Sequence, residues 1–257
     1  MQLLSGKVIF LTGGTEGIGL ECARVYKRAG AKLSIISNSA GSLAHAEEHL
    51  NGNDMLYIQA DVSSAADVKN AIEKTIAYYG QIDVIHNNAG ISDPSKALHD
   101  TGDDEWQRLF DVNVKGIYHT VKYGIEALIK TKGTILNTSS LAGEIGQAIH
   151  AAYCATKGAV SALTKSMAID YAPYGIRVNS VAPAGVWTPM LRNWSAQQPD
   201  PQSIEKYLND IHLLGYCPEA DVIADACLFL VSDQARFITG CILPVGGGAE
   251  LGYRRDK

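Results

Sequence analysis

Tyr153 and Lys157 are the residues whose types and spacing point most directly to chemistry. They stand at i and i+4, so on a helix both side chains project from one face and the ammonium can lie beside the phenol. A free tyrosine titrates near pKa ~10, and bringing it close to neutrality needs roughly 4 kcal/mol of differential stabilisation of the phenolate. A fixed cation in a partly dry cleft can supply much of that, which gives a proton donor and acceptor suited to interconverting an alcohol and a carbonyl. The same pair also arises by chance on many helices as solvated side chains, so the elements around it decide between the two interpretations.

Two polar features accompany this pair. Residues 133–139 form an apolar run typical of a strand, and Ser139 and Ser140 follow at its carboxyl end, where open parallel sheets bind ligands. Asn113 interrupts a helical pattern that runs from residue 103 towards residue 130. Because an unsatisfied buried amide costs roughly 1 to 3 kcal/mol, we expect Asn113 either to lock a local bend or to hold an ordered water.

A glycine-rich turn predicts a phosphate site near the start of the chain. Residues 7–12 read as a short strand, the segment G-G-T-E-G-I-G follows, and a helical pattern begins at Leu20. Gly13, Gly17 and Gly19 would let the backbone approach a ligand closely, and the helix N-terminus offers unpaired N–H groups to a pyrophosphate. The spacing G-x-x-x-G-x-G departs from the G-x-G-x-x-G dinucleotide fingerprint, so a purely structural turn stays open as an alternative.

The residue type at the end of the second strand bears on the choice between NAD and NADP. An acid there would bind the adenosine 2'-hydroxyl and a base would accept a 2'-phosphate, whereas this chain has Ser37 and Asn38. Glu16 in the glycine loop would repel a 2'-phosphate, which favours NAD weakly, although a solvated glutamate is an equal alternative. Asp61, after the third strand, could accept from an adenine amino group or serve as a turn residue.

The order of predicted elements indicates an α/β fold. Strands at residues 7–12, 31–37, 55–60, 82–86, 133–139, 176–181 and 240–245 alternate with helices, which predicts a doubly wound parallel sheet, a Rossmann fold of about seven strands with helices on both faces. No linker or repeat divides the chain, so residues 1–257 are expected to form one domain. The stretch from about 188 to 216 is read as irregular with one short helix around 203–210, and we interpret it as a mobile substrate lid rather than a surface excursion. A last helix is expected at residues 218–231.

Composition excludes several classes of function. The 257 residues are 46% hydrophobic and 19% charged, with a formal net charge of -5 and a pI of about 5.8, which argues against a nucleic-acid surface. Five scattered cysteines without a C-x-x-C pair are typical of reduced thiols in a cytoplasmic protein. No apolar run is long enough to span a bilayer, and export is not expected.

The joint pattern resembles the short-chain dehydrogenase/reductase family over essentially the whole chain. T-G-G-T-E-G-I-G at residues 12–19 is similar to the family's T-G-x-x-x-G-x-G cofactor loop, and N-N-A-G at residues 87–90 is similar to its structural motif. Asn113, Ser140, Tyr153 and Lys157 fall in the order and spacing of the family's catalytic tetrad, which implies that Ser140 rather than Ser139 is the catalytic serine. Two departures stand out: Pro183-Ala184 occupies a position where the family commonly has P-G, and Gly246 stands where an aspartate is frequent.

The resemblance implies how an NAD or NADP molecule would lie. Asp61 and Val62 would border the adenine, and Val186 and Thr188 would hold the nicotinamide carboxamide. The full set of residues expected to bind the cofactor is Gly13, Thr15, Glu16, Gly17, Ile18, Gly19, Ser37, Asn38, Asp61, Val62, Asn88, Ala89, Gly90, Tyr153, Lys157, Pro183, Ala184, Val186 and Thr188. Lys157 would lower the pKa of Tyr153 and also bond the nicotinamide ribose.

The substrate side is expected to combine apolar walls with possible polar selectors. Candidate substrate-binding residues are Ser140, Leu141, Ala142, Glu144, His150, Trp187, Met190 and Trp194. Their polar members suit a small polyol, sugar or cyclic alcohol, and the tryptophans suit a hydroxysteroid or other bulky ring. The expected activity is therefore the interconversion of a secondary alcohol and a ketone by hydride transfer.

Two rival interpretations belong to other classes. A protein that senses nucleotides without turnover could keep this fold, but the intact Tyr153 and Lys157 argue against it. A metal-dependent enzyme is not expected, because the seven histidines are read as forming no H-x-x-x-H or H-E-x-x-H cluster, and no metal ligand is assigned. Family members of this type imply a homotetramer or homodimer, with no nucleic-acid or membrane partner.

Overall fold

A seven-stranded parallel sheet forms the centre of the molecule. The computed structural model describes residues 2–50, 52 and 54–251. The strands lie in the order β3-β2-β1-β4-β5-β6-β7, and every neighbouring pair is parallel. Their bounds are β1 Val8–Thr12, β2 Lys32–Ser37, β3 Met55–Gln59, β4 Val84–Asn87, β5 Thr134–Thr138, β6 Arg177–Pro183 and β7 Ile242–Val245. The central strands β1, β4 and β5 are buried at every position, as expected for a sheet covered on both faces. The predicted doubly wound fold is confirmed.

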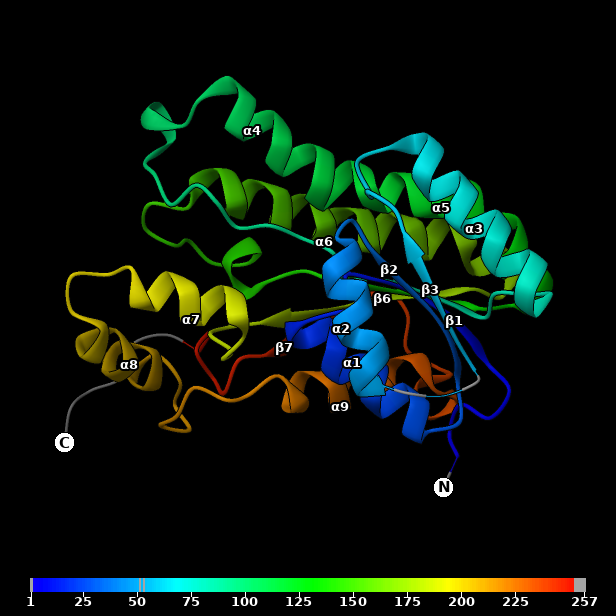
Figure 1. The fold of residues 1–257 in the computed structure, drawn as a ribbon. Helices are drawn as coiled ribbons and strands as arrows, with labels where there is room; N and C mark the ends of the chain where they lie inside the picture. Colours follow the sequence, from blue (N-terminus) through cyan, green and yellow to red (C-terminus); the bar gives the residue numbers. More distant parts are fainter. Residues whose placement is uncertain (1, 51, 53, 252–257) are drawn as a thin grey trace.

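Helices cover the sheet in two layers (Figure 1). On one face lie α3 (Ala65–Tyr79), α4 (Asp103–Phe110), α5 (Gly116–Thr131) and α6 (Ala151–Tyr171), and on the other α1 (Gly17–Arg28), α2 (Ala40–Leu50) and α9 (Asp221–Val231). Each layer encloses its own apolar core. The α1/α9 core contains Cys22, Tyr26 and Ile223, and the other contains Ile85 and Val160.

The predicted helix interruption at Asn113 is a π-helical turn. Asp111–Lys115 joins α4 to α5 without a loop. Such turns insert an extra residue into a helix and often occur at functional sites. The helical pattern is therefore interrupted at Asn113, as expected, by a change of helix type.

The stretch after β6 is more ordered than predicted. It contains two helices, α7 (Pro189–Ala196) and α8 (Pro201–Asp210), where only the second was expected. Thr188 caps α7 because its hydroxyl accepts from the Leu191 amide, and Pro189 suits the first helical turn. The prediction of an irregular chain from residue 190 was wrong for this reason. Two other helix bounds also differ: α1 begins at Gly17 instead of Leu20, and α9 begins at Asp221 instead of Pro218.

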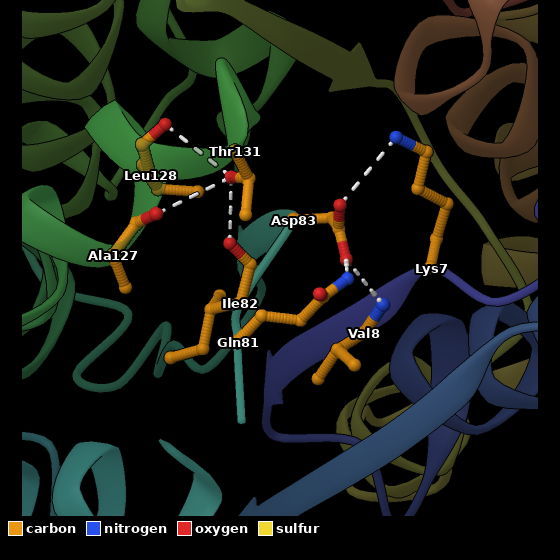
Figure 2. Close-up of polar contacts among 8 residues, drawn as sticks. All are labelled: Lys7, Val8, Gln81, Ile82, Asp83, Ala127, Leu128 and Thr131. Carbon is orange, nitrogen blue, oxygen red and sulfur yellow. Dashed lines mark hydrogen bonds and ion pairs between the residues drawn. The ribbon is translucent and has the colours of Figure 1, made fainter. Parts of the chain in front are cut away.

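The amino ends of the central strands are joined by a buried carboxylate (Figure 2). Asp83, just before β4, accepts from the Val8 amide at 2.8 Å and from the Gln81 side chain at 2.7 Å, and its other oxygen pairs with Lys7 at 3.4 Å. A buried carboxylate needs such partners. Beside it, the Thr131 hydroxyl at the end of α5 donates to the Ile82 carbonyl at 2.9 Å. These contacts fix the register of the strands at the edge opposite to the candidate site.

Among the described helices, none combines the length and apolar character that crossing a bilayer requires.

Candidate active site

A cleft of about 930 Å³ lies along the carboxyl ends of the strands. Segments that follow β1 to β6 line its floor, and α4, α6, α7 and α8 contribute its walls. The cleft lies at the upper end of the ~300–1,000 Å³ range of ligand pockets. It spans the point where the strand order reverses between β1 and β4, which is where open α/β sheets bind ligands.

The glycine loop fits a phosphate-bearing ligand. Gly13 has φ +62°, and a Cβ there would lie 2.9 Å from the Ala89 Cα atom; a Cβ on Gly19 would lie 1.9 Å from the Gly13 carbonyl oxygen. Gly17 has φ +52° and faces Thr188, which a Cβ would approach to 3.3 Å. Only glycine fits these positions without displacement. The loop therefore leaves the N-terminus of α1 open to the cleft, which suits a dinucleotide pyrophosphate.

The end of the cleft beside β2 and β3 is neutral to acidic. Ser37 and Asn38 line it, together with Asp61 and Val62. Asp61 has a turn role, because its Oδ1 accepts from the amide and the hydroxyl of Ser63 at 2.8 and 2.7 Å. It also lines the cleft, so the two alternatives for Asp61 are compatible.

Tyr153 and Lys157 share one face of α6, as their spacing predicts. The Lys157 Nζ atom lies 5.7 Å from the centroid of the Tyr153 ring and donates to the Thr138 carbonyl at 2.8 Å. Gly90 lies beside this group: a Cβ there would be in ordinary contact with the ammonium at 3.5 Å and closer, at 3.2 Å, to the Asn113 Oδ1 atom. Both side chains line the cleft between the glycine loop and the helices α7 and α8.

The two serines after β5 have different roles in the structure. Ser139 is buried, and its hydroxyl donates to the Lys157 carbonyl at 2.9 Å and contacts Ser161 at 3.1 Å. Ser140 is less buried and lines the cleft; its hydroxyl accepts from the Ala142 amide at 3.2 Å and lies near enough to the Tyr153 phenol to lower the pKa of that group. The position of Ser140 suits a group that contacts substrate, whereas Ser139 anchors α6.

Burial shifts the pKa values of both members of the tyrosine–lysine pair. It lowers the pKa of Lys157 from 10.5 to about 8, because the charged form loses hydration. It raises the pKa of Tyr153, and the hydrogen bond from Ser140 opposes that rise. The predicted lowering of the Tyr153 pKa is therefore not seen in the free protein. Desolvation is the largest cause of the rise, and the Lys157 Nζ donates to the Thr138 carbonyl.

Asn113 lies behind the cleft and does not line it. It is 2% exposed, and its side chain accepts from the Ile91 amide and donates to the Ile91 carbonyl, both at 2.9 Å, and to the Thr156 hydroxyl at 3.0 Å. The amide thus ties the π-helical turn to α6 and to the segment after Gly90. Two roles were expected for Asn113, fixing the local backbone or holding a water, and these hydrogen bonds correspond to the first.

Most of the predicted cofactor and substrate residues line the cleft. The exceptions are Gly19, which is buried behind the loop, and two substrate candidates, Glu144 and Trp187. Glu144 is exposed after the turn Leu141–Gly143. The Trp187 ring is covered by the Arg192 guanidinium, 5.0 Å from its centroid. Those two residues are corrections to the predicted substrate set.

His150 is buried and already hydrogen-bonded. Its Nδ1 lies 2.9 Å from the Ala148 carbonyl and its Nε2 lies 2.9 Å from the Ser95 hydroxyl. Since a carbonyl oxygen only accepts, Nδ1 carries the proton and Nε2 accepts from Ser95. The ring lines the cleft within 6.5 Å of the Tyr153 ring, centroid to centroid.

One wall of the cleft, formed by α4, was not predicted from the sequence. The cleft-lining face of α4 and the turn after it carries polar residues at helical spacing, and that i, i+3, i+4, i+7 pattern was the available signal. Other missed lining residues lie after β4, before α6 and on α8. These residues are Asp104, Gln107, Arg108 and Asp111, with Ile91, Ser92, Gln147, Tyr207, Leu208 and Ile211.

Two groups of potential metal ligands lie outside the cleft. His45, Glu48 and His49 are exposed on α2, and Cys22, His86 and Cys227 are buried, with the ligand atoms of each group within 4.8 Å of one another. The expectation of no histidine cluster overlooked the spacing of His45 and His49, which the structure brings together with ring centroids 4.1 Å apart.

Comparisons with known proteins agree with this geometry. The model of the family described as "Enoyl-(Acyl carrier protein) reductase" matches residues 13–250. The chain is 37% identical over 251 residues to L-fucose dehydrogenase of Bos taurus, which covers 98% of this chain and 92% of that protein. It is 38% identical over 252 residues to 2,5-dichloro-2,5-cyclohexadiene-1,4-diol dehydrogenase of Sphingobium indicum, which covers 96% and 98%.

A solved structure extends the likeness to the fold. The 3-ketoacyl-(acyl-carrier-protein) reductase from Brucella melitensis complexed with NADH superimposes with a TM-score of 0.90 at 32% identity, covering 96% of this chain and 99% of that one. The cleft accordingly has the architecture of a nicotinamide-dependent oxidoreductase acting on CH–OH groups, and the chain belongs to the short-chain dehydrogenase/reductase family.

Proposed function

We propose that the protein oxidises a secondary alcohol of a polyol, sugar or cyclic alcohol to the ketone, and catalyses the reverse reduction, with NAD as the preferred cofactor. The observation that carries this proposal is the position of Tyr153, Ser140 and Lys157 in one cleft, between a glycine loop at one end and a wall with polar side chains at the other. Relatives named for a sugar and for a cyclic diol support the substrate class.

The chain's own residues account for proton transfer. In oxidation, the Tyr153 phenolate removes the hydroxyl proton of the substrate, and Ser140 donates to the substrate oxygen as charge develops there. The Lys157 ammonium stabilises the phenolate, and Asn113 holds the segment after Gly90 in place through Ile91. A bound nicotinamide would supply the hydride acceptor for oxidation at the carbinol carbon and the hydride donor for reduction of the ketone. Each step reverses in reduction.

NAD is preferred because the adenosine end offers nothing to a 2'-phosphate. Among the described residues that line the cleft, only Lys157 and Arg108 are basic lysine or arginine side chains, and they lie on α6 and α4. Ser37 and Asn38 can hydrogen-bond ribose hydroxyls, and Glu16 and Asp61 would repel an extra phosphate.

A bulky-ring alcohol, such as a hydroxysteroid, is the second candidate. Met190, Trp194, Leu208 and Ile211 from the lid region line the cleft, and this apolar wall suits a fused ring. We include residues 188–216, with α7 and α8, in the proposal as the substrate lid of a single domain.

Assembly and compartment complete the proposal. We infer a cytoplasmic homotetramer or homodimer, and the large apolar side chains left exposed support an interface. Ile169 at the end of α6 is 76% exposed, and Phe237 before β7 is fully exposed.

The test is a panel of polyols, sugars, cyclic diols and hydroxysteroids, with the matching ketones, assayed with NAD and with NADP. We expect turnover of a polar alcohol with NAD, and loss of turnover in Tyr153→Phe while NADH binding stays within a few-fold. Oxidation should accelerate as pH rises and reduction should slow, because Tyr153 must be deprotonated for the first and protonated for the second. Full activity in Tyr153→Phe would refute the mechanism, and turnover confined to hydroxysteroids would select the second candidate.

A further inference from the structure

A row of buried polar side chains runs beneath the glycine loop. It starts at Tyr26 on α1, passes through His86 on β4 to Thr138 at the end of β5, and ends at Asn88. Tyr26 and His86 are both 0% exposed. An imidazole in such a core is costly unless both nitrogens are bonded. Here Nδ1 lies 3.1 Å from the Tyr26 hydroxyl and Nε2 lies 3.1 Å from the Thr138 hydroxyl.

The partners fix where each proton lies. The Asn88 side chain donates through Nδ2 to the Gly13 carbonyl at 3.0 Å, which directs its Oδ1 towards Thr138. Thr138 donates its single hydroxyl proton to that Oδ1 at 3.2 Å. It must therefore accept from His86, so Nε2 carries a proton, and in the neutral imidazole Nδ1 then accepts from Tyr26. The result is one unbroken direction of donation, from Tyr26 to Gly13.

The far end of this row is the dinucleotide site. The Asn88 amide nitrogen would lie 2.5 Å from a Cβ on Gly19 and 3.2 Å from one on Gly13, so it packs inside the glycine loop. Thr138 also presents its main-chain carbonyl to Lys157. The position of the His86 imidazole thus affects the glycine loop, which faces the phosphates. It also affects the Thr138 carbonyl, which accepts from the Lys157 ammonium.

We propose that His86 is a positioning residue for the cofactor: its ring, protonated at Nε2, holds Thr138, and through it Asn88, against the glycine loop. The inference rests on the proposed placement of the dinucleotide. His86 touches none of the reacting atoms, so its removal should weaken dinucleotide binding far more than turnover at saturation.

A metal centre is the competing explanation for this histidine. Cys22, His86 and Cys227 lie close enough for three ligands. However, the thiols are fully buried, and desolvation raises the pKa of Cys22 well above its usual value, which opposes the thiolate that a metal needs. Tyr26 also bonds the imidazole Nδ1 that faces this group.

Three variants test the proposal by direct titration with NADH and by steady-state kinetics. His86→Leu removes both hydrogen bonds and should raise the Kd for NADH about tenfold, the equivalent of one net hydrogen bond, with kcat at saturating cofactor within threefold. His86→Gln can still donate to Thr138 and should recover most of the affinity. Cys227→Ala is the matched control, because it alters the same core outside the row and should lower stability without changing the Kd. In the unaltered protein, imidazole nitrogen chemical shifts should report the Nε2–H tautomer.

The outcomes separate the two levels of the proposal. A wild-type Kd in His86→Leu, an equal loss of affinity in Cys227→Ala, or no recovery in His86→Gln would overturn the role of His86. One equivalent of zinc in the purified protein, lost in His86→Leu, would replace that role with a metal centre. If the unaltered protein bound neither NADH nor NADPH, the proposed function itself would fall.

Discussion

The two walls of the cleft differ in how their side chains are held. On the inner wall, formed by the end of β5, the π-helical turn and α6, the ammonium of Lys157 is buried and bonded to a main-chain carbonyl, and directly behind this wall the amide of Asn113 is held in the same way. On the opposite wall, formed by α7 and α8, which we propose as the lid, the ion pairs Arg192–Glu219 and Lys206–Asp210 are more than half exposed. Met190 and Tyr207 are also about half exposed.

From this difference we infer that catalysis and substrate selectivity depend on different walls of the cleft. Buried polar groups with fixed partners keep a reacting geometry constant, but each is costly if a partner is lost. A lid with exposed pairs and apolar contacts can change shape at little cost, since surface ion pairs contribute only ~0–1 kcal/mol. We therefore expect substitutions on the inner wall to affect turnover and stability, and substitutions on the lid to affect the choice of substrate.

The largest effect is expected for Lys157→Met. Loss of the ammonium should lower kcat by about 10³-fold, yet the variant should be more stable than the parent at pH 7. The lowering of the Lys157 pKa from 10.5 to about 8 corresponds to a cost of roughly 3 kcal/mol for burying the charge, and the lost bond to Thr138 offsets part of the gain. We expect a net increase of ~1–3 kcal/mol in the free energy of unfolding.

The pH dependence sharpens this prediction. Native Lys157 releases its proton near pH 8 and the unfolded chain near 10.5, so between these values the unfolded state binds more protons and wild-type stability rises with pH. The advantage of Lys157→Met should shrink over that window in urea titrations. Lys165→Met, an exposed position on the same helix, is the control. A Lys157→Met protein less stable than the parent at pH 7 would contradict the prediction.

Asn113→Ala should have the next largest effect. It leaves the amide and carbonyl of Ile91 without their side-chain partner, which we expect to lower the free energy of unfolding by ~2–4 kcal/mol. Asn193→Ala, on the exposed surface of lid helix α7, should change it by no more than ~0.5 kcal/mol. Urea unfolding of the pair measures the comparison directly, and equal losses would remove the distinction between the two walls.

Trp194→Ala should change selectivity. The ring lines the cleft, so its removal should raise the KM for the alcohol about fivefold to tenfold, with kcat and the KM for NAD within twofold. Trp187→Ala, at a tryptophan outside the cleft lining, should leave all three within twofold. A larger effect at Trp187 than at Trp194 would show that the lid binds substrate in another arrangement.

The smallest effect is expected for Arg192→Gln. Its ion pair with Glu219 is more than half exposed on both sides, so thermal unfolding should report a change of no more than ~0.5 kcal/mol. A loss above ~1 kcal/mol would mean that the lid is held more rigidly than its exposure indicates.

The sheet and the inner wall were predictable from local patterns. Alternating strands and helices, the glycine turn and the Tyr153–Lys157 spacing each depend on a few neighbouring residues, and α6 has the predicted bounds. The polar face of α4 could have been read from its period. The position of Trp187 depends on a partner, Arg192, that no local pattern pairs with it. The rise in the Tyr153 pKa depends on burial by several elements at once, which spacing alone does not reveal.

The π-helical turn sets the orientation of α4 relative to α5, so this orientation depends on the number of residues in the turn. One additional residue in a helix turns everything beyond it by about 100° relative to an unbroken α-helix. Because of this rotation, α4 directs Asp104 and Arg108 towards the cleft. The helix α5, which follows without a loop, buries Ile117, Val121 and Leu128 in the core. Deleting one residue between 111 and 115 would therefore swing the whole polar stripe of α4 away from the substrate without altering any of its side chains.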